Sequence, residues 1–318
     1  MLTQTNSAQG AVLGALVGDA AGARLEFLGR LPTEQENAEA LAMLGGGVWG
    51  VAPGQVTDDG ELSIALLRAL SAVGKFDLER IANEYRRWSE SSPFDIGGTI
   101  GSTIGVGEDA KAMQRVAREH IGSKANGSLM RCSPLGVWGW RVPSDELADC
   151  ARLDSSLSHA SPTCMDAVAC YVVAIAQLIC QSGHRREAAD AAKEWAHENA
   201  CAEVQEWLCL AESDSEVPGY PHQGFVKIAF VHAFRHLHRG TSYLEAIRSV
   251  LAIGGDTDTN ACIVGGMVGA SVGVEGIPLQ MRSAVLECDT NLGRRRPEWL
   301  WAKQVPELLR NVVERQQD

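Results

Sequence analysis

Glycine recurs at every fourth position near the start of the chain, at Gly10, Gly14, Gly18 and Gly22. On an α-helix this spacing places the glycines on one face, where the absence of side chains lets another backbone approach closely. Glycine is unfavourable inside a helix, so the stripe needs a packing reason. The same spacing returns late in the chain, at Gly265, Gly269 and Gly273. We therefore predict that two smooth helices from distant parts of the sequence lie close together.

Most of the chain carries apolar residues at helical spacing, whereas almost no segment shows the strict alternation of a half-buried strand. Glycine and proline break the helical pattern at 44–54, which is expected to be a loop. Helices are predicted over residues 61–73, 77–90, 103–120, 164–180, 188–210, 225–238 and 243–253. The sequence therefore predicts an all-α fold.

The chain has 318 residues, of which 45% are hydrophobic, so it has ample material for a core. Polar residues 1–9 are expected to form a loose tail, and residues 10–318 a single domain. The net charge of −12 argues against a general nucleic-acid-binding surface or an acidic-membrane surface. Nothing in the sequence demands more than a monomer.

Nine cysteines are dispersed without a CxxC pair, which is expected for reduced and buried thiols. The N-terminus lacks a basic leader before an apolar core, so no signal peptide is predicted. The apolar run at 8–18 stops at Asp19, before it reaches the length of a membrane span. These features predict a cytoplasmic protein that does not contact membranes.

The segment 254–260 reads GGDTDTN and stands between apolar stretches, with no lysine or arginine within five residues on either side. Carboxylates in apolar surroundings are costly unless a positive charge meets them. Asp256, Asp258 and Thr259 offer only oxygen atoms, which suit a hard cation such as Mg²⁺, Mn²⁺ or Ca²⁺. This stretch therefore predicts one part of a metal site.

A second set of oxygen-bearing side chains, Thr57, Asp58 and Asp59, immediately precedes the predicted helix 61–73. Asp and Thr often cap helices, but one cap needs only one residue. Each of the two segments places two aspartates and one threonine between a loop and a helix. We therefore predict that the two corners share one or two cations.

Two other readings of the 256–260 segment fail on particular residues. An Asp-x-Asp-x-Thr string also begins haloacid-dehalogenase-type phosphotransferases, but Asn260 departs from that pattern and the required parallel sheet is not predicted. An EF-hand loop starting at Asp256 needs glycine at 261 and glutamate at 267, where this chain has Ala261 and Met267.

A zinc site is a further possibility at another place in the chain. His232 and His236 have zinc-ligand spacing but lack the glutamate of the HExxH pattern.

Further candidates are weaker when each is taken alone. Asp19 and Glu26 stand at the edge of the first glycine stripe and are candidates for the border of a site. Asp95 lies in a predicted loop, as a turn residue or a substrate contact. The small-residue loop 122–131 offers backbone N–H groups and hydroxyls that suit phosphate oxygens. His159 precedes a long apolar helix, where histidine is more often a capping or core residue than a ligand.

Six motifs in order carry a resemblance to a known family. They are GAVLGALVGDAAGARLEF (10–27), GQVTDDGELSIAL (54–66), FDIGGT (94–99), NGSLMR (126–131), LSHASPTC (157–164) and GGDTDTNACIVGGMVGA (254–270). Together they resemble the ADP-ribosylglycohydrolase family from about Gly10 to about Pro278. The resemblance implies an all-α orthogonal bundle with two divalent cations, Mg²⁺ or Mn²⁺, in a cleft.

The resemblance also implies roles for individual residues. The implied metal ligands are Thr57, Asp58, Asp59, Asp256, Asp258 and Thr259. The residues implied to face ADP-ribose are Gly122, Ser123, Asn126, Gly127, Ser128 and His159. Glu26 is expected in a flap near the metals, and Asp95 near the leaving group. The chain departs from many relatives at Gly60 and Ala160, and neither departure removes a ligand.

The reaction implied is hydrolysis of the bond between C1″ of ADP-ribose and an acceptor, commonly an arginine of a protein, with free ADP-ribose as product. Asp58, Asp256 and Glu26 are the candidates for the catalytic base, and the sequence does not choose among them. A member of the same fold that binds ADP-ribose or a partner without catalysis is the alternative.

Overall fold

The computed structural model describes residues 2–314, and within this range the chain forms helices and no strand. The α-helices are α1 (Gln4–Gly22), α2 (Glu34–Leu41), α3 (Asp58–Val73), α4 (Leu78–Glu90), α5 (Gly98–Thr103), α6 (Ala110–Glu119), α7 (Ser133–Gly139), α8 (Ser144–Ser155), α9 (Pro162–Cys180), α10 (Arg185–Asn199), α11 (Ala202–Glu212), α12 (Val226–Arg239), α13 (Tyr243–Ala252), α14 (Thr257–Val272), α15 (Leu279–Leu286) and α16 (Val305–Glu314). Short 3-10 helices are η1 (Val274–Gly276), η2 (Thr290–Leu292), η3 (Glu298–Leu300) and η4 (Ala302–Gln304). The predicted all-α fold is confirmed.

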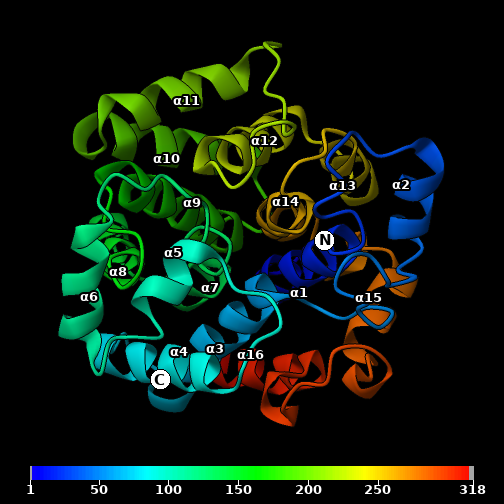
Figure 1. Ribbon diagram of the computed structural model, residues 1–318. Coiled ribbons are helices and arrows are strands. Elements are labelled where there is room, and N and C mark those ends of the chain that lie inside the picture. Colours follow the sequence, from blue (N-terminus) through cyan, green and yellow to red (C-terminus); the bar gives the residue numbers. More distant parts are fainter. Residues whose placement is uncertain (1, 315–318) are drawn as a thin grey trace.

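Helices α1 and α14 lie against each other at the centre of the molecule, with the other helices around them (Figure 1). Figure 1 shows α14 end-on while α11 runs across the view, as expected for an orthogonal bundle. A Cβ atom placed on Gly14 would lie 2.3 Å from the carbonyl oxygen of Gly265, and one on Gly10 would lie 2.1 Å from that of Gly269. Real Cβ atoms do not approach other atoms so closely, so the two backbones touch only because both glycine stripes are present. The predicted contact is confirmed.

The last glycine of the stripe, Gly273, is the C-cap of α14. Its φ of 74° is left-handed, and its amide donates a hydrogen bond to the carbonyl of Gly269. Gly273 still belongs to the contact with α1, because a Cβ atom on Gly10 would lie 2.9 Å from the carbonyl carbon of Gly273. The predicted stripe of Gly265, Gly269 and Gly273 therefore faces α1 along its whole length.

Residues 4–9 belong to α1, so the prediction of a loose tail over 1–9 is wrong for them. Thr3 is the N-cap, and its side chain accepts a hydrogen bond from the amide of Asn6. Ser7, Ala8 and Gly10 are buried, since the first turns of α1 continue its packing on the core. Met1 lies outside the described residues.

Two predicted helices are each divided in two. The span 103–120 is broken between α5 and α6, where the side chain of Asp109 caps α6 by accepting from the amide of Ala112. The span 188–210 is broken at residues 200–201. There, Asp166 of α9 accepts a hydrogen bond of 2.7 Å from the amide of Cys201, which takes that amide out of helical bonding. The second break therefore depends on a contact between distant residues.

Helix α9 lies within the core and packs against α8 and α10. By length and composition alone it could cross a membrane, but 83% of its apolar window is buried inside the fold, as in a core helix of a globular protein. All nine cysteines are free thiols, and Cys164 and Cys170 of α9 are among those buried in the core. The dispersed spacing predicted free thiols correctly, but the prediction that they are buried is wrong for Cys209, which is exposed, and for Cys150, Cys180, Cys201 and Cys288, which are partly exposed.

The α1–α14 contact predicts that Gly14→Ala destabilises the protein. Alanine is the better helix former by about 1 kcal/mol, but its methyl group would lie 2.3 Å from a backbone oxygen that cannot move alone. We expect a net loss of about 1–3 kcal/mol in the free energy of unfolding, measured with urea. Gly122→Ala is the matched control, because no atom lies within 4 Å of a Cβ atom there. Equal effects of the two substitutions would contradict the packing argument.

Candidate active site

The first corner of the site is the start of α3, which is held by a side chain of α1. Thr57 stands at the N-cap position but makes no capping hydrogen bond. Instead, Asp19 accepts hydrogen bonds from the amides of Thr57, at 3.1 Å, and Gly60, at 2.8 Å. A Cβ atom on residue 60 would lie 2.6 Å from the Asp19 carboxylate, so Gly60 permits this approach. Because Asp19 supplies the cap, the side chains of Asp58 and Asp59 are available for another role.

The second corner is the start of α14. The turn before it uses the left-handed conformation at Gly254 and Gly255, with φ of 66° and 80°. The hydroxyl of Thr257 donates to the carbonyl of Gly22 at 2.9 Å. A Cβ atom on Gly22 would lie 2.4 Å from the Cα atom of Asp258. The last turn of α1 therefore lies directly against the first turn of α14.

The two corners meet at the carboxylate of Asp59. Its Oδ2 atom accepts hydrogen bonds from the hydroxyls of Thr57, at 3.4 Å, and Thr259, at 3.3 Å. The structure thus brings together the two segments that the sequence analysis had paired. The roles of their side chains as metal ligands stay a prediction.

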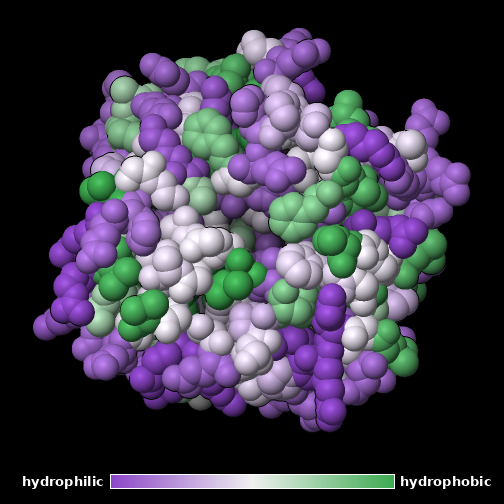
Figure 2. Space-filling model, viewed as in Figure 1, coloured by the Kyte–Doolittle hydropathy of each residue, from purple (hydrophilic) through white to green (hydrophobic). Residues whose placement is uncertain are grey.

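A cavity of about 310 Å³ opens beside the two corners. Figure 2 shows it as the hollow near the centre of the visible face. Its charged lining consists of carboxylates, and no lysine or arginine of the described residues lines it. The predicted site residues that line it are Glu26, Asp58, Asp95, Asn126, Gly127, His159, Asp256, Asp258 and Thr259. Thr57 and Asp59 are buried beside it, and Asp59 accepts hydrogen bonds from the hydroxyls of both Thr57 and Thr259.

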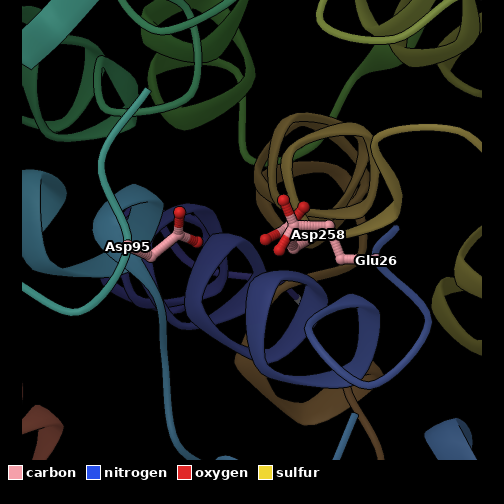
Figure 3. A group of neighbouring side chains, drawn as sticks. All are labelled: Glu26, Asp95 and Asp258. Carbon is pink, nitrogen blue, oxygen red and sulfur yellow. The ribbon is translucent and has the colours of Figure 1, made fainter. Parts of the chain in front are cut away.

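Three carboxylates from separate segments converge in the cavity (Figure 3). Glu26 follows α1, Asp95 lies in the loop between α4 and α5, and Asp258 lies in the first turn of α14. One oxygen atom of each lies within 4.8 Å of an oxygen atom of the other two. Like charges so close together are unfavourable unless they are neutralised by protons or by a cation.

The pKa values of these carboxyl groups respond to that environment. Burial, together with the charge of the neighbouring carboxylates, raises the pKa of Asp58 to about 6, that of Glu26 to about 7 and that of Asp95 to about 9. Burial and neighbouring charges also raise the pKa values of Asp59 and Asp258 well above the usual range.

The donor set fits a divalent cation. The Oδ1 atom of Asp59 is buried and has no hydrogen-bond partner. The carboxylate and hydroxyl oxygens around it are the ligands that hard cations such as Mg²⁺ and Mn²⁺ prefer. A cation would supply the positive charge that is missing from the lining of the cavity. The residues present are therefore suited to hold one.

The other wall of the cavity contains neutral polar groups. Asn126 donates a hydrogen bond of 2.8 Å to Asp256, and Gly127 packs so close to His159 that a Cβ atom would lie 2.9 Å from its ring. The Nδ1 atom of His159 pairs with the hydroxyl of Ser158, whereas Nε2 is buried without a partner. Burial lowers the pKa of His159 to about 3, so the ring is neutral near pH 7. This wall can offer hydrogen bonds without adding charge.

Three residues predicted to face ADP-ribose do not line the cavity. Gly122 is exposed, and Ser123 pairs through its hydroxyl with Thr99 at 3.1 Å. Ser128 is buried and accepts a hydrogen bond from Ser155. Of the loop residues predicted to face ADP-ribose, Asn126 and Gly127 line the cavity, and Ala125 and Met130 of the same loop line it as well.

Some residues that line the cavity, or that hydrogen-bond to its lining, were not predicted. Gly97 donates its amide to Asp58 at 3.2 Å, and Trp49 donates its ring N–H to Glu26 at 2.7 Å. The FDIGGT motif contains Gly97, but its glycines alone give no sign of this bond. Gln223 and Gly224 come from a segment with only loop-like composition. They reach the site because the carbonyl of Gly224 accepts from the amide of Asn126 at 3.0 Å.

A buried ion pair holds the loop that carries Asn126 and Gly127. Arg131 is completely buried and pairs with Asp154 at 3.2 Å. The guanidinium also donates to the carbonyl of Gly127 and to the hydroxyl of Ser158, which in turn pairs with His159. The guanidinium of Arg131 therefore holds in place both the loop with Asn126 and Gly127 and, through Ser158, the ring of His159.

With fold and site described, comparison with known proteins assigns the class. The family model for ADP-ribosylglycohydrolase matches residues 2–317. An ADP-ribosyl glycohydrolase of Acanthamoeba polyphaga mimivirus is 30% identical over 308 residues, which cover 88% of this chain and 91% of that protein. The chain therefore belongs to the ADP-ribosylglycohydrolase family.

Further relatives agree with this assignment. The ADP-ribosyl-[dinitrogen reductase] glycohydrolase of Rhodospirillum rubrum is 30% identical over 85% of this chain and 87% of its own length. An ADP-ribosylarginine hydrolase of Pseudomonas putida (strain GB-1) is 25% identical over 97% of this chain and 78% of its own length. A solved structure described as an ADP-ribosylglycohydrolase-related protein complex has the same fold, with a TM-score of 0.77, 22% identity and 98% coverage of both chains.

The buried ion pair yields a stability prediction. Asp154→Asn leaves the guanidinium of Arg131 buried without a counter-charge, so we expect the free energy of unfolding to fall by about 3–5 kcal/mol in urea titrations. Asp214→Asn is the control, because Asp214 pairs with Arg239 at 2.7 Å but its side chain is 99% exposed. Exposed pairs contribute about 0–1 kcal/mol. A similar small effect of both substitutions would show that Asp154 does not carry the loop.

Proposed function

We propose that this chain is a metal-dependent hydrolase that releases ADP-ribose from a modified acceptor, most favourably ADP-ribosyl-arginine on a protein. The observation that carries the proposal is the convergence of two distant acidic corners on one cavity, to whose lining residues 2–314 contribute no lysine or arginine. All six candidate ligand positions keep an oxygen-bearing side chain, which favours catalysis over a non-catalytic binding role.

The proposed metal site holds two divalent cations, Mg²⁺ or Mn²⁺. The residues proposed to hold them are Thr57, Asp58, Asp59, Asp256, Asp258 and Thr259. Bound there, the cations would supply positive charge that orients the ribose hydroxyls and lowers the pKa of an attacking water. The support for this assignment is the fit of the donor set and the unpartnered Oδ1 atom of Asp59.

The proton from the attacking water needs an oriented acceptor, and three carboxylates qualify. Each accepts one hydrogen bond that fixes its direction: Glu26 from the Trp49 ring, Asp58 from the Gly97 amide, and Asp256 from Asn126. Each therefore keeps a second oxygen for a cation or for the water. A positioned carboxylate of this kind typically accelerates proton transfer by a factor of about 10²–10⁴.

The neutral wall of Asn126, Gly127 and His159 is proposed to face ADP-ribose. The unpartnered Nε2 atom of His159 offers a hydrogen bond to a neutral or anionic group, according to its tautomer. The cavity volume of about 310 Å³ lies within the range of small-molecule sites. Gly122, Ser123 and Ser128 are proposed to support this loop rather than to contact the ligand.

The charge of the cavity favours a cationic acceptor. Asp95 and Glu26 lie close together in the cavity, and neither forms an ion pair with a lysine or arginine of residues 2–314. A guanidinium carries the complementary charge and binds carboxylates well. We therefore propose an ADP-ribosylated protein as substrate, hydrolysed to the unmodified protein and free ADP-ribose.

The activity prediction concerns an ADP-ribosyl-arginine protein as substrate. We expect release of free ADP-ribose with Mg²⁺ or Mn²⁺, no release with EDTA, and a fall of more than about 100-fold in kcat/KM for Asp256→Ala, because a ligand and candidate base is lost. The release is measured by chromatography of the free nucleotide. Metal-bound protein that releases nothing from arginine-, serine- or ester-linked substrates would support the non-catalytic alternative.

The cation prediction does not depend on catalysis. A cation that binds only the folded protein stabilises it by about 2.7 kcal/mol at 100 times its Kd. We expect Mg²⁺ or Mn²⁺ to raise the Tm of the wild type and EDTA to reverse the rise. Asp258→Asn should lose most of this shift, whereas Asp149→Asn, on the exposed face of α8, should keep it. The same rise in both variants would place the cation elsewhere.

A further inference from the structure

Phe27, next to Glu26, has an unusual combination of exposure and backbone conformation. Its side chain is 53% exposed although it is a large apolar group, and its φ is 58°. A left-handed φ is rare for a bulky residue, because the side chain crowds the backbone. Unfavourable backbone conformations of this kind tend to cluster at functional sites. Core packing does not explain Phe27, because more than half of its surface faces outward.

Phe27 stands at the end of a row of three aromatic rings. Its ring packs edge-on against Trp49 with centroids 6.1 Å apart, and Trp49 packs edge-on against Phe94 at 6.0 Å. The three rings come from three loops, which follow α1, precede α3 and follow α4. The N–H of Trp49 is directed to Glu26, at 2.7 Å. The aromatic row is thus tied to the carboxylate that enters the cavity.

The position of Phe27 relates the aromatic row to the acidic cavity. Phe27 lines the cavity together with Glu26 and Asp95, whereas Trp49 and Phe94 do not line it. Ile96, 40% exposed, also lines it and adds a second apolar side chain at this side. A group that enters here meets a fixed aromatic ring and carboxylates in the same cavity. That combination suits a flat organic cation better than an uncharged acceptor.

We propose that Phe27 is a specificity residue of the acceptor subsite, and that its ring receives the guanidinium of the ADP-ribosylated arginine while Glu26 and Asp95 supply the opposite charge. The inference rests on the proposed function. A guanidinium over an aromatic face is attracted by the electrons of the ring, an interaction that an aliphatic side chain does not provide. Trp49 and Phe94 act as positioning residues, since they hold the ring of Phe27 in its exposed orientation.

The test uses Phe27→Leu, which keeps an apolar side chain at the same backbone position but removes the aromatic face. Hydrolysis is measured on two peptides of the same sequence, one with ADP-ribosyl-arginine and one with ADP-ribosyl-serine. We expect kcat/KM on the arginine peptide to fall about 3- to 30-fold. The rate on the serine peptide, the Tm and the Kd for free ADP-ribose, measured by calorimetry, should be unchanged. Leu279→Ala, at a residue that is 69% exposed and outside the cavity, is the control.

If the wild type does not cleave the serine peptide, inhibition by agmatine tests the role of Phe27 instead. Agmatine carries a free guanidinium, and its inhibition constant against the arginine peptide should rise by the same factor in Phe27→Leu. Equal losses on both peptides, or an unchanged rate and inhibition constant, would overturn the role of Phe27.

The outcomes also separate the two proposals. A wild type that releases ADP-ribose from no substrate would refute the proposed function itself. A wild type that hydrolyses the serine peptide alone would leave a metal-dependent hydrolase intact but would refute the guanidinium subsite. A changed Kd for free ADP-ribose in Phe27→Leu, with an unchanged preference between the peptides, would assign Phe27 to the ADP-ribose side instead.

Discussion

The contact between the backbones of α1 and α14 supports the rest of the structure. Because Gly14 and Gly265 carry no side chains, the two helices approach until atoms of their main chains touch. The same pair of helices also positions both corners of the site, at the starts of α3 and α14. Asp19 of α1 caps α3, and Gly22 at its end lies against the backbone of Asp258. A small change in the separation of the two helices would therefore move every carboxylate relative to its neighbours.

The site itself opposes folding, and the surrounding core must offset that cost. Burial and mutual repulsion raise the pKa values of Asp58, Asp59 and Asp258, so each ionised group is less stable here than in water. Arg131 makes a contrasting arrangement a short distance away, where a buried charge has its partner, Asp154, and several hydrogen bonds. The buried charges of Arg131 and Asp154 neutralise each other, whereas the carboxylates of the cavity are suited to a cation from solution.

The sequence predicts those features that depend on local pattern. The glycine stripes, the start of α3 and the start of α14 repeat residue types at helical or turn spacing, and the structure confirms where they meet. Contacts between distant residues leave no such trace. The break at 200–201 depends on Asp166 of another helix, and the direction of Glu26 depends on Trp49. The loop 122–131 was identified by its small residues, but its pairing with Gly224 decides which of them reach the cavity.

The pairing of α1 with α14 also determines when the site can form. These helices come from widely separated parts of the sequence, so the closing of a very long loop must precede their contact. During synthesis the first helix emerges with its glycine face uncovered, and the partner that covers it arrives only after most of the chain has been made. The acidic corner at the start of α3 therefore lacks its counterpart in every shorter nascent chain. The two acidic corners therefore meet only after α14 has been synthesised.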